Sequence, residues 1–308
     1  MAPIDQSVQA GLTVSEYYHK IESRLGYNLL LGGTRHFGFY PAGTWSPFPI
    51  NGALRAMEEY LFRLLDVPPD ALVLDGGAGV CDVAIYMASR GARVHAIDLL
   101  NLHVGWGMRN VARRHASDEV QVSQMSFQQL DFNDSTFDGA YTMETLVHAT
   151  DPDAAMREFF RVLKPGATMV HIEYEHDGCP DSAVRRKLQR VNSGSSMPAF
   201  TQFAPYGAIR KRLEAVGFED VEVNDLSLNV LPMLRLFVVL AFVPYLIIRL
   251  LQLQDHFVNT MAAVDMYRIR HHIRFVSIRA RKPRSDGRRR QQRTATSDKS
   301  DGDLYRRG

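Results

Sequence analysis

A glycine-rich loop between two acidic residues is the part of this sequence best suited to chemistry. The loop is Asp75-Gly76-Gly77-Ala78-Gly79, and it follows the apolar run 71–74. Glycine lets a backbone turn tightly and approach a ligand, because a Cβ at those positions would collide with it. A second predicted strand ends in Asp98, where an acid can accept ribose hydroxyls in nucleotide-binding α/β folds. The two acids favour a ligand that carries a ribose and a positive charge but no phosphate.

The residues after this loop predict a helix that points its N-terminus at the ligand. Residues 80–89 would direct free N–H groups and the positive end of the helix dipole toward the loop. The dinucleotide fingerprint G-x-G-x-x-G fails here, because Asp82 occupies its last position. A nicotinamide oxidoreductase is therefore the weaker enzyme class, and a plain βαβ unit without a ligand is the simplest alternative.

Alternating strands and helices must position these groups, and they predict an α/β fold with a mostly parallel, doubly wound sheet. The seven predicted strands span 71–75, 93–98, 120–125, 137–143, 168–173, 221–224 and 273–280. The predicted helices span 14–25, 51–65, 80–89, 103–115, 152–163, 183–191 and 206–216. Asn51 is expected to cap the second of these helices, and Lys164-Pro165-Gly166 to end the helix that begins at Pro152.

The chain divides by composition into a core and its appendages. The divisions are an N-terminal cap (1–50), a Rossmann-like cofactor-binding core (51–227), an apolar insertion (228–270), a last core strand (271–283) and a disordered basic tail (284–308). Only 13 charge-free residues lie between Arg235 and Arg249, too few to span a bilayer. With Pro232 and Pro244 interrupting it, the insertion is expected to be a lid or a membrane-interface segment. A core helix pair and a single span are the alternatives.

Charge and cysteine content exclude some classes of protein. Residues 279–308 hold 11 Lys/Arg and 4 Asp/Glu, so the net charge of +2 conceals a body of about −5. An acidic body argues against a nucleic-acid partner. The two cysteines, Cys81 and Cys179, form no disulfide framework, and the first residues lack a signal peptide. We therefore expect a cytoplasmic protein, with membrane association as the alternative, and no metal site, because no His and acid cluster has ligand spacing.

These motifs together resemble the class I S-adenosylmethionine (SAM) methyltransferases, and within them the sterol 24-C-methyltransferase group. The pattern D-x-G-x-G is typical of the fold, and Met143-Glu144-Thr145-Leu146-Val147-His148-Ala149 is similar to the E-x-x-x-H-A segment of that group. Arg161-Val162-Leu163-Lys164-Pro165-Gly166 and Thr34-Arg35-His36-Phe37 are similar to two further family segments. The resemblance implies a seven-stranded Rossmann-like sheet, SAM as cofactor and a small-molecule methyl acceptor. The chain departs from the family at Cys81, which replaces the third loop glycine, and at the apolar insertion, which replaces the family's C-terminal third. SAM binding remains expected, but these departures argue against a sterol as the substrate.

The resemblance and the strand ends together give a set of expected site residues. The expected cofactor-binding residues are Asp75, Gly76, Gly77, Gly79, Asp98, Leu99, His103, Ser126, Phe127 and Met143. The expected substrate residues are His36, Phe37, Tyr40, Glu173 and Tyr174. Glu144 and His148 are the expected catalytic pair, because the carboxyl edge of a parallel sheet is where ligands bind.

The chemistry expected is methyl transfer to a lipophilic small molecule, such as an isoprenoid or another specialised metabolite. Transfer to an alkene carbon is slightly favoured over O- or N-methylation, because a carboxylate and aromatic rings can stabilise the resulting cation. Glu144 and His148 can equally be structural hydrogen-bonding groups. A catalytically silent SAM-binding protein that docks on a membrane is the remaining alternative.

Overall fold

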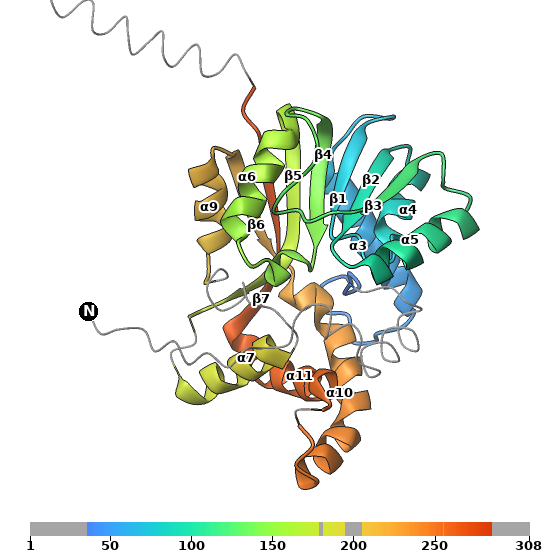
Figure 1. The fold of residues 1–308 in the computed structure, drawn as a ribbon. Coiled ribbons are helices and arrows are strands. Elements are labelled where there is room, and N and C mark those ends of the chain that lie inside the picture. The colour runs from blue at the N-terminus through green and yellow to red at the C-terminus, as the bar shows by residue number, and fades with distance from the viewer. Residues whose placement is uncertain (1–35, 179–180, 195–204, 255, 285–308) are drawn as a thin grey trace, which may run out of the picture.

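The computed structural model describes residues 36–178, 181–194, 205–254 and 256–284. The expected helix at 14–25, Cys179 and the tail beyond Arg284 lie outside these residues. Within them, one seven-stranded sheet organises the molecule, with the strand order β3-β2-β1-β4-β5-β7-β6 (Figure 1). The predicted Rossmann-like α/β class is therefore confirmed.

Five strands run parallel and form the half of the sheet that carries the glycine loop. They are β1 (Leu72–Gly76), β2 (Arg93–Asp98), β3 (Val120–Gln124), β4 (Phe137–Met143) and β5 (Leu163–His176). The last strand, β7 (Ile273–Arg281), inserts antiparallel between β5 and β6 (Glu219–Asp225). The carboxyl ends of β1, β2 and β4 therefore meet at one edge, as their register requires.

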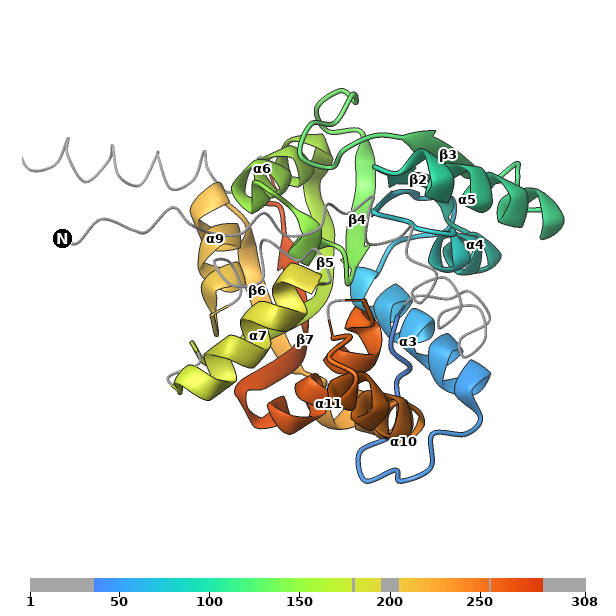
Figure 2. The same ribbon diagram turned by 60° about the horizontal axis from the view of Figure 1, so that its bottom comes forward.

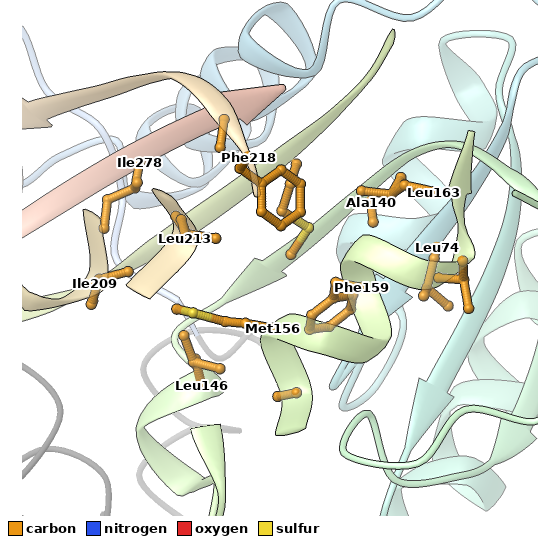
Figure 3. Close-up of a cluster of buried hydrophobic side chains, with 14 of the residues drawn as sticks. Leu74, Ala140, Leu146, Met156, Phe159, Leu163, Ile209, Leu213, Phe218 and Ile278 are labelled. Carbon is orange, nitrogen blue, oxygen red and sulfur yellow. The ribbon is translucent and has the colours of Figure 1, made fainter. Parts of the chain in front are cut away.

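Helices cover both faces of the sheet and create two hydrophobic cores. On one face lie α3 (Ile50–Leu65), α4 (Asp82–Ser89) and α5 (Asn101–Arg113), which bury apolar side chains against β1, β2 and β3. On the other face lie α6 (Pro152–Val162) and α9 (Ala208–Val216). Figure 3 shows this second core, where Met156 and Phe159 of α6 lie near Ile209 and Leu213 of α9.

Of two expectations about helix ends, one is wrong and the other holds to within one residue. Asn51 does not cap α3, because the helix already begins at Ile50 and its N-cap is Pro49, which offers no side-chain acceptor. Helix α6 ends at Val162, one residue early, because Leu163 turns into β5 and pairs with Phe137. Lys164-Pro165-Gly166 thus belongs to the strand, with Gly166 at a φ of 85°.

The part of the apolar insertion that carries the two prolines forms one continuous helix, contrary to the expected interruption, and a second helix follows it. Helix α10 (Ser227–Leu250) contains Pro232 and Pro244, and it packs beside α11 (Val258–Arg268). With α7 (Ser182–Gly194) these helices gather at one end of the molecule (Figures 1 and 2). A proline removes one helical hydrogen bond but does not have to end a helix that is packed elsewhere. Of the described helices, α10 is the one long and apolar enough to cross a membrane by length and composition. Two 3₁₀ turns, Leu146–His148 and Arg270–His272, complete the described elements.

Candidate active site

The glycine loop is fixed tightly against the segment that follows β4. Gly77 has a φ of 88°, and a Cβ there would lie 2.7 Å from the side chain of Thr145. The hydroxyl of Thr145 donates to the carbonyl of Gly76 at 2.9 Å, and the Gly77 and Ala78 amides donate to Ile97. Only glycine satisfies both the backbone conformation and the close approach. Thr145 and Ile97 therefore fix the loop in a conformation in which Gly77, Ala78 and Gly79 line the pocket.

Asp98 at the end of β2 is held ionised by three donors. Its carboxylate accepts hydrogen bonds from the amides of Gly79 and Leu100, each at 2.9 Å, and from Nδ1 of His103 at 3.1 Å. Burial works to raise the pKa of Asp98, but these hydrogen bonds outweigh it and the pKa lies below its ordinary value. A carboxylate offers about four acceptor positions, so roughly one is left for a ribose hydroxyl.

Asp75 at the end of β1 is also a buried acid, but its pKa is shifted in the opposite direction from that of Asp98. Its side-chain atom Oδ2 is buried and has no hydrogen-bond partner among the described residues. Burial raises the pKa of Asp75 to about 7, with the nearby charge of Asp98 acting in the same direction and the hydroxyl of Tyr141 acting against it. The cationic amino group of a ligand would supply the missing partner.

One pocket at the carboxyl edge gathers most of the expected site residues. The expected residues that line it are Asp75, Gly77, Gly79, Asp98, Leu99, His103, Ser126, Phe127, Met143, Glu144, His148 and His36. Gly76 lies outside the lining, because a Cβ there would meet the ring of Phe159 in the core. Phe37, Tyr40, Glu173 and Tyr174 also lie behind the pocket wall.

Glu144 holds the N-terminal segment against the sheet. The residue follows β4 with a left-handed φ of 55°, which is uncommon outside glycine. Its Oε1 accepts from the amide of Phe37 at 2.8 Å, and its Oε2 accepts from the hydroxyl of Tyr174. Burial raises the pKa of Glu144, while both hydrogen bonds act to lower it. Both oxygens are thus bonded within the chain.

Glu173 and Tyr40 have structural contacts of their own. The Glu173 carboxylate accepts from the amides of Thr145 and Leu146, at 2.9 and 2.6 Å, and so supports the turn that carries His148. Burial raises the pKa of Glu173 to about 8. The Tyr40 hydroxyl donates to the carbonyl of Pro47 at 2.8 Å. Neither side chain faces the pocket.

A buried acid that the sequence analysis missed lies behind His36. Glu58 of α3 is 2% exposed, and its Oε2 accepts from Arg55 at 2.6 Å. Its Oε1 lies 3.6 Å from Nε2 of His36, which has no hydrogen-bond partner, while Nδ1–H of His36 donates to the carbonyl of Phe37. Burial works to lower the pKa of His36, but the charge of Glu58 outweighs it and raises this pKa above 6.5. The sequence could have predicted that Glu58 is buried, because this residue lies on the apolar stripe of Leu54 and Leu61.

Comparisons with known proteins agree with the fold and the pocket described above. A methyltransferase domain model matches residues 74–171. The SAM-dependent Diels-Alderase iccD of Talaromyces variabilis is 39% identical over 88% of this chain and 94% of its own. The 24-methylenesterol C-methyltransferase 3 of Arabidopsis thaliana is 29% identical over 57% of this chain and 49% of its own. The [4+2]-cyclase SpnF shares the fold, with a TM-score of 0.70 and 20% identity over 90% of this chain and 98% of its own.

The fold, the pocket and these relatives define a class, the class I SAM-dependent enzymes. The chain belongs to the SAM-dependent methyltransferase family, of the type that acts on small molecules of specialised metabolism. SAM is its cofactor, and the prediction that the chain is a SAM-dependent methyltransferase is confirmed. The residues present fit this cofactor, since Asp98 keeps an acceptor for ribose and Asp75 has an unpartnered buried oxygen.

Proposed function

We propose that the pocket at the carboxyl edge holds SAM through the expected cofactor residues. Asp98 would accept from a ribose hydroxyl, and Leu99, Ser126 and Phe127 would surround the adenine. The loop from Gly77 to Gly79 would hold the methionine end, with Asp75 as acceptor for its amino group. The support is that these side chains line one pocket and that two of the acids have acceptor capacity left.

We propose further that the second ligand is a lipophilic polyene and that the reaction is an intramolecular [4+2] cyclisation. The observation that carries this proposal is the 39% identity to a SAM-dependent Diels-Alderase across nearly the whole of both chains. Such a cyclisation forms two carbon–carbon σ bonds from π bonds, and nothing leaves. It therefore needs orientation and exclusion of water rather than a base. The internal hydrogen bonding of both Glu144 oxygens is consistent with this requirement.

His36 can contribute positive charge beside such a substrate. Positive charge near a carbonyl conjugated to the dienophile lowers the barrier by stabilising the charge that develops on oxygen. His36 lines the pocket, and Glu58 favours its protonated form. Both ring nitrogens face groups of the chain, Nδ1 the carbonyl of Phe37 and Nε2 the carboxylate of Glu58, so His36 would act through its charge and not as a hydrogen-bond donor.

Methyl transfer to an alkene carbon is the second candidate. It is favoured by the similarity to a sterol C-methyltransferase over residues that include the Glu144 and His148 segment. When bound, SAM supplies a sulfonium group, which is a positive charge in the first reaction and a methyl donor in the second. Methyl transfer to an alkene carbon leaves a cation on the neighbouring carbon, and a proton must then leave a carbon next to that cation to re-form an alkene. His148, which lines the pocket, would be placed to accept it.

One incubation distinguishes the two reactions. The purified chain is mixed with SAM carrying a trideuterated methyl group and with a synthetic linear polyene amide that contains a diene and an alkene conjugated to a carbonyl. Mass spectrometry and chromatography follow the products. A product of unchanged mass, with SAM required but not consumed, supports cyclisation. A product that gains the labelled methyl group, with S-adenosylhomocysteine released, supports methyl transfer instead.

A further inference from the structure

The far half of helix α10 carries an apolar face that the rest of the described chain leaves uncovered. Val239 is 71% exposed, Val243 62% and Leu250 82%, and Leu246 and Ile247 lie between them. At 100° per residue these positions, together with Leu240 and Phe242, cover about half of the helix circumference. Monomeric proteins rarely expose apolar side chains in so continuous an arrangement, and such patches mark interaction surfaces.

The opposite face of this half of α10 packs against α11. Tyr245 and Ile248 are buried against Met261 and Val264 of α11. The hydroxyl of Tyr245 accepts a hydrogen bond from Arg268 at 2.5 Å, and the Arg268 guanidinium lies over its ring. The hairpin of α10 and α11 is thus held together from within.

Positive charge predominates in this region, where the sequence holds four arginines against two acids, Asp255 and Asp265. Among the described residues between 226 and 272, four arginines (Arg235, Arg249, Arg268 and Arg270) accompany a single acid, Asp265. Asp265 is 1% exposed and lies 3.9 Å from Arg268. Arg249 lies at the end of the apolar face, and Arg235 lies at its beginning, stacked over the exposed ring of Trp45 at 4.3 Å. The face therefore runs between two cations.

We propose that this face docks on a membrane surface that contains anionic lipids. Apolar side chains bordered by arginines suit the boundary between headgroups and acyl chains, where the arginines reach the phosphates. A second copy of the chain is a poorer occupant, because pairing this face with itself would bring like charges together. The 13 residues between Arg235 and Arg249 cover only about 20 Å, so the helix lies in the interface and does not span the bilayer.

The near half of α10 connects this face to the pocket. The amide of Tyr40 donates to the carbonyl of Asn229 at 2.9 Å, and the ring of Phe237 lies 5.7 Å from that of Phe37. Phe37 is the residue whose amide is bound by Glu144. A lipophilic substrate dissolved in the membrane would thus meet the enzyme at a helix that packs on Phe37 and Tyr40, next to the pocket.

Co-sedimentation with vesicles tests the proposal. The full chain is mixed with phosphatidylcholine vesicles prepared with and without phosphatidylserine. We expect binding to the vesicles with phosphatidylserine, and weaker binding as salt increases. The double variant Leu246→Glu, Leu250→Glu should reduce that binding about tenfold or more, because two leucines no longer leave water.

The control is Met108→Glu, which changes an apolar side chain of similar exposure (54%) on the distant helix α5. This variant should bind vesicles like the unmodified chain, and SAM titration should show that all the variants stay folded. The proposal is overturned if the unmodified chain ignores vesicles or if the double variant binds as well as the control. It is also overturned if analytical ultracentrifugation shows a dimer that the double variant converts to monomers, since the occupant would then be a second copy.

Discussion

The two halves of the pocket are built from different kinds of contact. On the SAM side, Asp98 is bonded to residues that lie 2, 5 and 19 positions away in the sequence. On the acceptor side, Glu144 is bonded to Phe37 across 107 positions, and Asn229 to Tyr40 across 189. The first half is a local motif that can be exchanged as a unit. The second half depends on the whole chain being folded, and it is where substrate choice would vary.

Removing Asp98 should give the largest effect on the SAM side. In Asp98→Ala the ribose loses an acceptor, and the amides of Gly79 and Leu100 lose theirs. Each charged hydrogen bond contributes about 1.5–3 kcal/mol, so SAM affinity should fall about 10²–10³-fold. Isothermal titration calorimetry with SAM measures this, and NADH is the comparison ligand. Unchanged SAM affinity would show that Asp98 does not belong to the SAM side of the pocket.

Changing His36 should have the largest effect on the acceptor side. His36→Gln removes the positive charge of this side chain, so it should slow the reaction about 10–10²-fold and leave SAM affinity unchanged. Because only the protonated imidazole carries the charge, the rate of the unmodified enzyme should fall as pH rises through the raised pKa of His36. The same raised pKa stabilises the fold fully below about pH 6.5, and this stabilisation is lost at higher pH.

The variant Glu58→Gln is the matched control for His36, because it keeps the size of the side chain and removes the charge that favours the imidazolium. Its rate should match the unmodified enzyme at low pH and fall at a lower pH than before. A pH profile that stays in place in Glu58→Gln would show that Glu58 has only a structural role.

Changes at Glu144 should separate a structural brace from a reacting group. Glu144→Ala leaves the Phe37 amide and the Tyr174 hydroxyl without their acceptor, which costs about 1–3 kcal/mol and should raise KM for the acceptor about tenfold. Glu144→Gln can accept from Phe37 and donate to Tyr174, so cyclisation should change little. A loss of about 10²–10⁴-fold in the Gln variant would instead indicate general-base chemistry and favour methyl transfer.

The smallest effect is expected from a pair of glycine variants. Gly77→Ala and Gly91→Ala both force alanine to a positive φ, of 88° and 93°. At Gly77 the new Cβ also meets Thr145 at 2.7 Å, whereas at Gly91 nothing lies within 4 Å. Gly77→Ala should weaken SAM binding severalfold and lower the melting temperature more than Gly91→Ala. Equal SAM affinities in the two variants would show that Thr145 gives way and does not fix the loop.

The sequence predicts the SAM side well because its signals are local. The strand that ends in Asp75, the glycines after it and Asp98 nineteen residues beyond Gly79 can be read directly from the chain. The acceptor side is predicted only in part. Glu144 and His36 could be named, but their partners Phe37, Tyr174 and Glu58 are brought together by tertiary packing. Tyr40 and Glu173 carry chemically suitable groups, yet they face other residues, which residue type alone cannot reveal. The continuous α10 was missed because a proline signal does not register the packing that stabilises a helix.

The place of β7 in the sheet has a consequence for how the chain matures. This strand pairs with β5 along nine positions and with β6 on its other edge, yet it is separated from β5 by almost a hundred residues that include α10. At about 5–20 residues per second, β5 is synthesised roughly 5–20 s before its neighbour β7, and its edge on that side stays unpaired until β7 is made. A chain truncated before Ile273 would keep this edge open permanently and is expected to aggregate. The strands that carry the SAM loop need no such late partner, because β1 pairs with β2 and β4, which are all synthesised before β5 is complete.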